Sequence, residues 1–200
     1  MGLGETAASR GAALLQLTSS ACPPALGYSP RFDPDCGAYT ESTLEHVIAD
    51  VRIRDIVLVA NYQQYLSENW PALAAGLGRT ISALQAAGKR VTLQAPVPNF
   101  HYPVPDALGE LVFRHRAPSA YGVDKREYLQ VNAGVLTSLY DLSTRYVVPL
   151  ISPAAVLCPT DRCRAVAGST ALYFDEFHLS IEGVRLLQPL YQAVFDALPH

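Results

Sequence analysis

The chain has 200 residues, of which 50% are hydrophobic and 16% are charged, and its formal net charge is −3. This size and composition fit one globular domain and exclude a disordered segment. The weakly acidic balance gives no electrostatic support for binding nucleic acid or an anionic membrane. No apolar run approaches the roughly 20 residues that span a bilayer, and the first residues lack the pattern of a signal peptide.

Apolar strands and amphipathic helices alternate along the predicted chain. The expected strands are at 12–19, 55–62, 90–98, 147–152 and 169–175. The expected helices are at 41–53, 69–88, 105–114, 125–146 and 180–198. Pro149 favours a sheet edge for its strand, Ser180 is placed to cap the last helix, and Pro189 should kink it. The pattern predicts one α/β domain over residues 1–200, with a mostly parallel sheet and helices on both faces.

Parallel sheets place functional residues at the carboxyl ends of their strands. The residues expected there are Asn61, Asn99, His101, Ser152 and the turn that carries Asp175 and His178. Asn61 either forms a turn through its side chain or donates a hydrogen bond to a developing oxyanion. His101 lies among prolines and aromatic residues, which favours a role at the rim of a site.

Asp175 and His178 stand three residues apart in "YFDEFHLSIEG". A histidine that acts as a general base needs a carboxylate to hold its tautomer and stabilise its cation. An Asp-x-x-His turn can supply both groups, but the spacing alone is a weak signal, and a structural histidine near a helix start is the alternative. The position before the last helix favours a catalytic pair.

The four cysteines form two local pairs that flank turn-rich loops, Cys22 with Cys36 and Cys158 with Cys163. This arrangement favours two disulfides and therefore an oxidising compartment. Two alternatives stay open at this point, reduced thiols in a cytosolic protein and a zinc site, although these spacings differ from those of common zinc motifs.

The segments "DEFHLSIEG" and "IVLVANY" resemble two sequence blocks of the SGNH/GDSL hydrolase family. A finer resemblance is to the SGNH domains fused behind the transmembrane domain of family-3 membrane acyltransferases. It rests on "SACPP", on "VTLQAPVPNF" and on a cysteine pair shortly before "YFDEFHLS". The resemblance covers nearly the whole chain from about residue 12.

The resemblance implies a flavodoxin-like three-layer α/β/α sandwich and ester chemistry on a serine nucleophile. Asp175 would orient His178, His178 would take the serine proton, and Asn61 would help to hold the oxyanion. It also implies an extracytoplasmic domain that passes acyl groups, usually acetyl, to a surface polysaccharide or related glycan. Its partners would be an acyl donor, a glycan acceptor and an upstream membrane acyltransferase domain. Nothing in the sequence implies a metal or organic cofactor.

The family's Gly-Asp-Ser block is absent from the sequence. We therefore expect the first strand and the nucleophile to lie upstream or to be lost, and an isolated chain without that strand should be poorly soluble. Ser9 should lie on a helix, and Ser19 or Ser20 is a minor candidate nucleophile. The second-block glycine could be Gly27 or Gly37. The alternative functions are a non-catalytic module that binds a glycan or partner, and a small cytosolic α/β protein with coincidental motifs.

Overall fold

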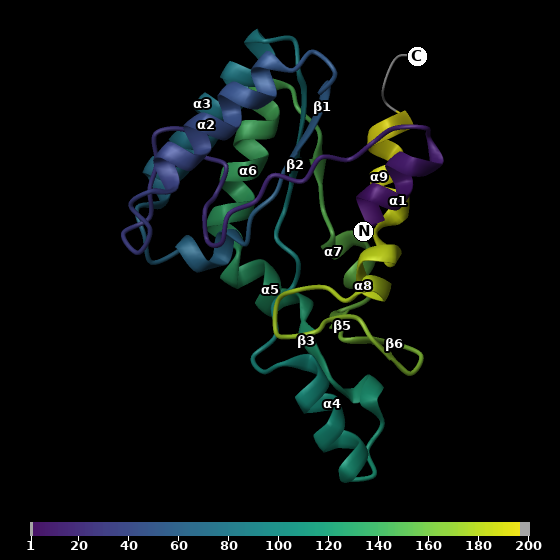
Figure 1. Ribbon diagram of the computed structural model, residues 1–200. Helices are drawn as coiled ribbons and strands as arrows, with labels where there is room; N and C mark the ends of the chain where they lie inside the picture. Colours follow the sequence, from purple (N-terminus) through teal and green to yellow (C-terminus); the bar gives the residue numbers. More distant parts are fainter. Residues whose placement is uncertain (1, 197–200) are drawn as a thin grey trace. The chain divides into compact units, whose positions relative to one another are not determined.

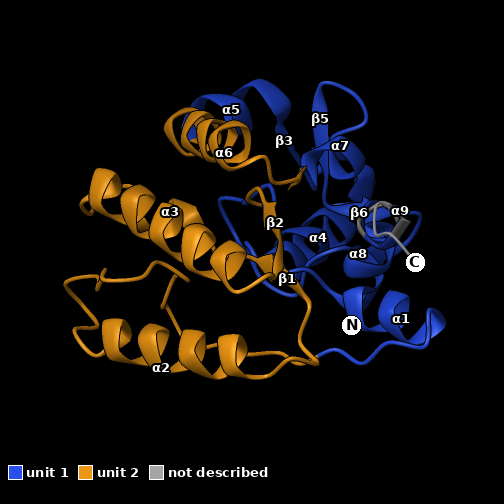
Figure 2. Ribbon diagram, turned by 90° about the horizontal axis from the view of Figure 1, so that it is seen from above, with its two compact units in different colours: residues 1–14, 97–131, 152–200 blue, residues 15–96, 132–151 orange. Residues whose placement is uncertain are grey.

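The computed structural model describes residues 2–196 (Figure 1). The chain forms two compact units, coloured separately in Figure 2. Unit 1 comprises residues 1–14, 97–131 and 152–200, and unit 2 comprises residues 15–96 and 132–151. Within residues 2–196, no helix has both the length and the hydropathy needed to cross a membrane.

Unit 2 contains a parallel sheet of β1 (Asp55–Leu58), β2 (Arg90–Gln94) and β4 (Leu150–Ile151), in the order β1-β2-β4. All of its strand pairs are parallel, as predicted. Asp55 pairs in register with Arg90, and their side chains form an ion pair at 2.6 Å. The strand β4 lies at the edge of the described sheet, as Pro149 indicated.

Four helical segments belong to unit 2, and they are α2 (Cys36–Ala49), η1 (Tyr62–Tyr65), α3 (Trp70–Ala86) and α6 (Ala133–Tyr146). The helix α3 begins where Asn69 accepts a hydrogen bond from the backbone N–H of Ala72, and it stops before Gly88, whose φ of +73° suits a glycine. The helix α2 begins earlier than predicted and ends before Val51, which is exposed to solvent.

A single apolar core holds unit 2 together. It takes side chains from the strands, from α2, α3 and α6, and from the loop that follows Cys22. Its fully buried members are Ala25, Tyr62, Leu73, Leu77, Ile81, Leu93, Val135 and Leu139. The periodic apolar positions of α3 therefore face this core, as an amphipathic helix requires.

The strand predicted at 12–19 is absent from the structure. These residues form neither a helix nor a strand, and no strand pairs with them among the described residues. The side chains of Leu14, Leu15 and Leu17 are 46%, 55% and 39% exposed, respectively. An apolar run becomes a strand only when a neighbouring backbone satisfies its N–H and C=O groups, so the sequence pattern alone was misleading here.

Unit 1 is built from short elements. Its strands form two antiparallel pairs, β3 (Gly122–Asp124) with β5 (Arg162–Arg164) and β6 (Val166–Ala167) with β7 (Thr170–Ala171). Its helical segments are α1 (Gly2–Ser9), α4 (Val104–Phe113), η2 (Pro118–Ala120), α5 (Lys125–Val131), α7 (Ala154–Leu157), α8 (Ile181–Leu186) and α9 (Gln188–Asp196). The first helix contacts the last two, and Glu5 accepts a hydrogen bond from Gln188 at 2.7 Å.

Two of the predicted helices are divided in the structure, one of them without any expected interruption. The helix expected at 125–146 divides into α5 and α6 at Asn132, where the chain passes from unit 1 to unit 2. The helix expected at 180–198 divides into α8 and α9 beside Pro189, which confirms the predicted interruption. The last two residues of that prediction lie outside the described residues.

The strand expected at 169–175 is shorter in the structure. Only β7 forms there, and it pairs with β6 outside the parallel sheet.

Candidate active site

The Asp175–His178 turn lies between β7 and α8, in the yellow-green part of the ribbon (Figure 1). Backbone hydrogen bonds close the turn from Phe174 to His178 at 3.0 Å and from Ser180 to Leu172 at 2.9 Å. The hydroxyl of Ser180 caps α8 by accepting from the N–H of Gly183 at 3.1 Å, as predicted. A Cβ on Gly183 would collide with the carbonyl of Leu172, so this close approach requires a glycine.

The two side chains of the pair are in direct contact. Asp175 Oδ2 lies 2.6 Å from His178 Nδ1. Asp175 Oδ1 accepts hydrogen bonds from the backbone N–H groups of Phe177 at 2.8 Å and His178 at 2.6 Å. Burial raises the pKa of Asp175, but hydrogen bonds from the His178 ring and these backbone groups outweigh burial, and the net pKa is below the usual value. The carboxylate is therefore ionised and fixed in position.

The turn follows a short antiparallel pair, so the expectation that it ends a strand of the parallel sheet was wrong. Where a long strand was expected, Tyr173 and Leu179 form an isolated antiparallel bridge, and the chain makes a tight turn around Asp175. Local hydrogen bonds to the aspartate orient the pair, and a long strand is not needed for this.

Aromatic rings surround the imidazole of His178. It stacks on Phe174 with ring centroids 5.1 Å apart and planes within 4°, and the ring of Phe177 lies 4.3 Å away. The side chain of His178 is 56% exposed, and within residues 2–196 its Nε2 has no hydrogen-bond partner. With Nδ1–H donating to Asp175, the neutral ring presents Nε2 as an acceptor, which is the arrangement of a general base.

The loop before α4 is tied to the same turn. The N–H of Phe100 donates to the carbonyl of Glu176 at 2.7 Å, and the N–H of Val104 donates to the carbonyl of Asp175 at 3.1 Å. The ring of Phe100 also packs against Tyr173 at 4.7 Å. Sequence reasoning missed this support, because backbone hydrogen bonds between distant loops leave no signal in residue identity.

Of the other candidate residues, His101 and Asn99 also lie in unit 1. His101 is exposed, and its Nε2 lies 2.8 Å from Glu127. Asn99 has a buried side-chain oxygen without a hydrogen-bond partner. Ser152 lies just after β4 and accepts a backbone hydrogen bond from Ala155.

Asn61 lies in unit 2, two residues beyond Val59 and directly before η1. Its backbone carbonyl accepts from Gln64, but its side chain forms no capping hydrogen bond. The side chain therefore does not act as a turn former, and its amide donors are available to a ligand. The role of Asn61 as an oxyanion-hole donor remains a prediction.

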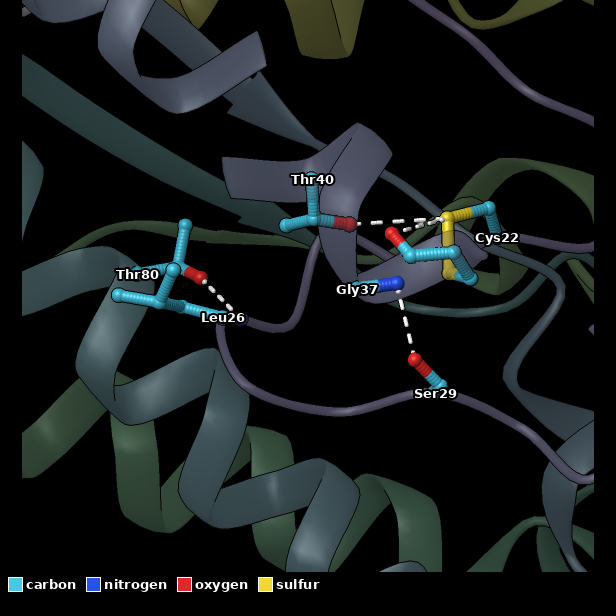
Figure 3. The surroundings of a disulfide bond; sticks show 7 residues. Cys22, Leu26, Ser29, Gly37, Thr40 and Thr80 are labelled. Carbon is cyan, nitrogen blue, oxygen red and sulfur yellow. Dashed lines mark hydrogen bonds between the residues drawn. A yellow bond between two sulfur atoms is a disulfide. The ribbon is translucent and has the colours of Figure 1, made fainter. Parts of the chain in front are cut away.

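Both predicted disulfides are present. Cys22 and Cys36 are bonded in unit 2, and Cys158 and Cys163 are bonded in unit 1. Because a disulfide sulfur carries no proton, the Thr40 hydroxyl donates to the Cys22 sulfur at 3.5 Å (Figure 3). The reduced-thiol and zinc alternatives are therefore wrong.

Of the two candidate second-block glycines, Gly27 lies in the loop closed by the first disulfide, and Gly37 follows Cys36 in the first turn of α2. The N–H of Gly37 is bound to the hydroxyl of Ser29 at 2.9 Å, as Figure 3 shows. Gly27 has a φ of +66° and faces Arg79. The N–H of Leu26, beside it, donates to the hydroxyl of Thr80 at 2.9 Å.

No serine hydroxyl lies within hydrogen-bond distance of His178 Nε2 in the described part of the chain. Ser180 is engaged as a helix cap, and the Ser9 hydroxyl donates to the carbonyl of Thr6 on α1. Between residues 2 and 196, no three His, Cys, Asp or Glu side chains gather as a set of metal ligands.

A scan against protein-family models matches residues 1–193 to the SGNH domain that is fused to AT3 domains. The chain belongs to this family. A solved structure, the periplasmic domain of a lipopolysaccharide acetyltransferase from Salmonella ser. Paratyphi A, is similar with a TM-score of 0.73 and 16% identity. The alignment covers 98% of this chain and 77% of that domain, so the SGNH chain shares its mixed α/β fold. A search of curated proteins gave no significant match.

Proposed function

We propose that this SGNH domain transfers acyl groups, acetyl in the first instance, to hydroxyl groups of a cell-surface glycan, or hydrolyses such esters. The observation that carries the proposal is the Asp175–His178 pair, with a 2.6 Å contact at Nδ1 and an exposed Nε2 that has no hydrogen-bond partner within residues 2–196. Membership of a family whose domains are fused to AT3 domains supports acyl transfer as the reaction class.

The reaction needs a serine hydroxyl as nucleophile, and because no serine of residues 2–196 lies beside His178 Nε2, a labelling experiment is needed to assign it. His178 Nε2 accepts the hydroxyl proton as the serine oxygen bonds to the acyl carbonyl carbon, and the carbonyl electrons move to the oxygen. When the tetrahedral intermediate collapses, the bond to the leaving group breaks and the imidazolium returns the proton to that group. A glycan hydroxyl or water then attacks the acyl-serine by the same steps, with His178 as base. Throughout, Asp175 stays ionised and stabilises the imidazolium.

Asn61 is the proposed oxyanion donor. Its side-chain amide makes no capping hydrogen bond, so it is available to a developing negative charge. One such donor contributes about 3–4 kcal/mol to the transition state.

The two disulfides support an extracytoplasmic location, because such bonds persist in oxidising compartments. We propose that the domain faces the periplasm or the cell exterior, next to a membrane acyltransferase domain of the kind that its family description names. The match over residues 1–193 supports a single SGNH-like domain spanning the chain.

The proposal is tested by hydrolysis of p-nitrophenyl acetate with the purified full chain. We expect His178→Ala to lower kcat/KM by about 10²–10⁴-fold, the usual contribution of a general base. The control His46→Ala changes an exposed histidine on α2 and should leave the rate unchanged. Asn61→Ala should lower kcat by about 10²–10³-fold with the melting temperature unchanged. Equal rates in wild type and His178→Ala would contradict the proposal.

The nucleophile is identified by labelling the protein with a fluorophosphonate probe and mapping the modified peptide by mass spectrometry. Labelling of one serine, lost in His178→Ala, is the expected result. The second candidate function is a non-catalytic glycan-binding module, which the lack of a serine beside His178 Nε2 favours. A folded protein with neither ester hydrolysis nor labelling would establish that alternative.

A further inference from the structure

A groove of about 380 Å³ runs along α4 in unit 1. Pro103, Ala107 and Leu111 form an apolar stripe in its lining, at a spacing of four residues along one face of the helix. Two aromatic residues, Tyr102 and Tyr121, complete the apolar part of the lining. The volume lies at the lower end of the range of about 300–1,000 Å³ for small-molecule pockets.

A polar stripe lies beside the apolar one. Asp106, Glu110 and Arg114 follow at the same four-residue spacing, and Arg116 lies just beyond the helix. The guanidinium of Arg114 contacts the carboxylate of Glu110 at 2.6 Å. Two carboxylates and two guanidiniums thus line the groove, and their formal charges cancel.

This combination of groups selects a chemical class of ligand. Carboxylates only accept hydrogen bonds and guanidiniums only donate them, so a ligand that uses both must offer donors and acceptors together. Hydroxyl groups do both. Because the two carboxylates and two guanidiniums cancel in formal charge, the groove offers no net electrostatic attraction to a phosphate or carboxylate ligand. A neutral pyranose ring instead offers hydroxyls for the polar stripe and C–H faces for the tyrosine rings.

The groove begins beside the candidate catalytic turn. The N–H of Val104, at the start of α4, donates to the carbonyl of Asp175. The rings of Tyr121, Phe100 and Tyr173 form a continuous packed row, with centroid distances of 5.5 and 4.7 Å. The helix then runs for roughly 15 Å along the groove. A polymer whose reacting unit lay at His178 could therefore extend neighbouring units along α4.

We infer that the α4 groove is an acceptor subsite that binds neutral pyranose units next to the sugar that receives the acyl group. This inference rests on the proposed function, because it assigns the acceptor side of the same site. Tyr102 and Tyr121 contact the faces of the sugar ring, and the polar stripe binds its hydroxyls. The Tyr121 hydroxyl donates to the backbone carbonyl of Tyr102 at 3.1 Å, which fixes the direction of the Tyr121 ring.

The test is a titration of the ¹⁵N-labelled full chain, followed by NMR. The probes are the methyl glycosides of glucose, galactose, mannose, rhamnose and N-acetylglucosamine, with inorganic phosphate as the anionic comparison. We expect at least one glycoside to shift amide signals within 102–121 at millimolar concentration. Tyr102→Ala should weaken its binding about fivefold, which corresponds to the loss of a contact of about 1 kcal/mol.

The matched control is Tyr140→Ala. Tyr140 lies on α6 in unit 2 and is 68% exposed, compared with 69% for Tyr102, so the two variants remove equally exposed rings. The Tyr102 variant keeps the backbone carbonyl that accepts from Tyr121. Arg116→Gln provides a second variant of the groove and should also weaken binding.

Three results would overturn the inference, namely no glycoside-dependent shifts in 102–121, equal affinities in Tyr102→Ala and Tyr140→Ala, or binding of phosphate alone. The titration requires no turnover, so glycoside binding can be judged independently of whether the protein hydrolyses esters. Unchanged ester hydrolysis in His178→Ala would contradict the proposed function while glycoside binding still stood. Hydrolysis dependent on His178 without glycoside binding would overturn the groove inference alone.

Discussion

Unit 2 is built around a parallel sheet and one large apolar core, whereas unit 1 is built from short antiparallel strand pairs and loops that hydrogen-bond to one another. The candidate catalytic pair and the α4 groove both belong to unit 1. Loops can be shaped to a substrate without disturbing a core, and binding residues are concentrated on them for this reason. Mutations in the two units can test how far the residues that stabilise the fold are separate from those of the candidate site.

The largest expected effect on stability comes from opening the core of unit 2. Leu77 is fully buried on α3, so Leu77→Ala should lower the free energy of unfolding by about 2–5 kcal/mol. The measurement is urea denaturation. The control Leu66→Ala removes a leucine of the same unit that is 40% exposed, and it should cost much less. Similar losses in both variants would show that α3 does not pack as described.

The two disulfides should contribute unequally. Cys22 and Cys36 are 14 residues apart, and Cys158 and Cys163 are 5 apart. Loop-closure entropy then predicts losses of about 3 kcal/mol for Cys22→Ala/Cys36→Ala and about 2 kcal/mol for Cys158→Ala/Cys163→Ala. Denaturant unfolding of both double variants, with reduced wild type as reference, measures the difference. A larger loss from the shorter loop would mean that unit 1 depends on its disulfide beyond chain entropy.

The smallest expected effect is a pH dependence of unit 1. The pKa of Asp175 is lowered in the folded state, so its ionised form stabilises the fold at pH values above the usual carboxyl pKa. That stabilisation is lost as the pH falls through the lowered pKa. The difference in unfolding free energy between wild type and Asp175→Asn should therefore shrink as the pH is lowered through the acid range. A difference independent of pH would contradict this.

Sequence reasoning succeeded where the signal is local. The apolar runs of β1 and β2 and the helix expected at 69–88 are elements that contribute to the core of unit 2 in the structure. The residues "DEFHLS" were sufficient to find the Asp175–His178 contact, because the two side chains meet within a single turn.

The failures have one physical cause, since each depends on a partner distant in sequence. The run at 12–19 has the composition of a strand but lacks a strand beside it in the described residues. The break at Asn132 occurs at a buried polar residue where the chain passes from unit 1 to unit 2, and helical periodicity does not predict such a break. The spacing of Asp106, Glu110 and Arg114 could have suggested a polar helix face, but only the fold places Tyr121 beside it.

The order of the two units along the chain affects how the protein folds during its synthesis. Unit 2 is complete once residue 151 has left the ribosome, whereas unit 1 pairs Glu5 on α1 with Gln188 on α9, 183 residues later. Contacts of such long sequence separation slow folding, because loop closure must come before they form. During translation, unit 2 can therefore fold as an intermediate, and the candidate catalytic turn is assembled last.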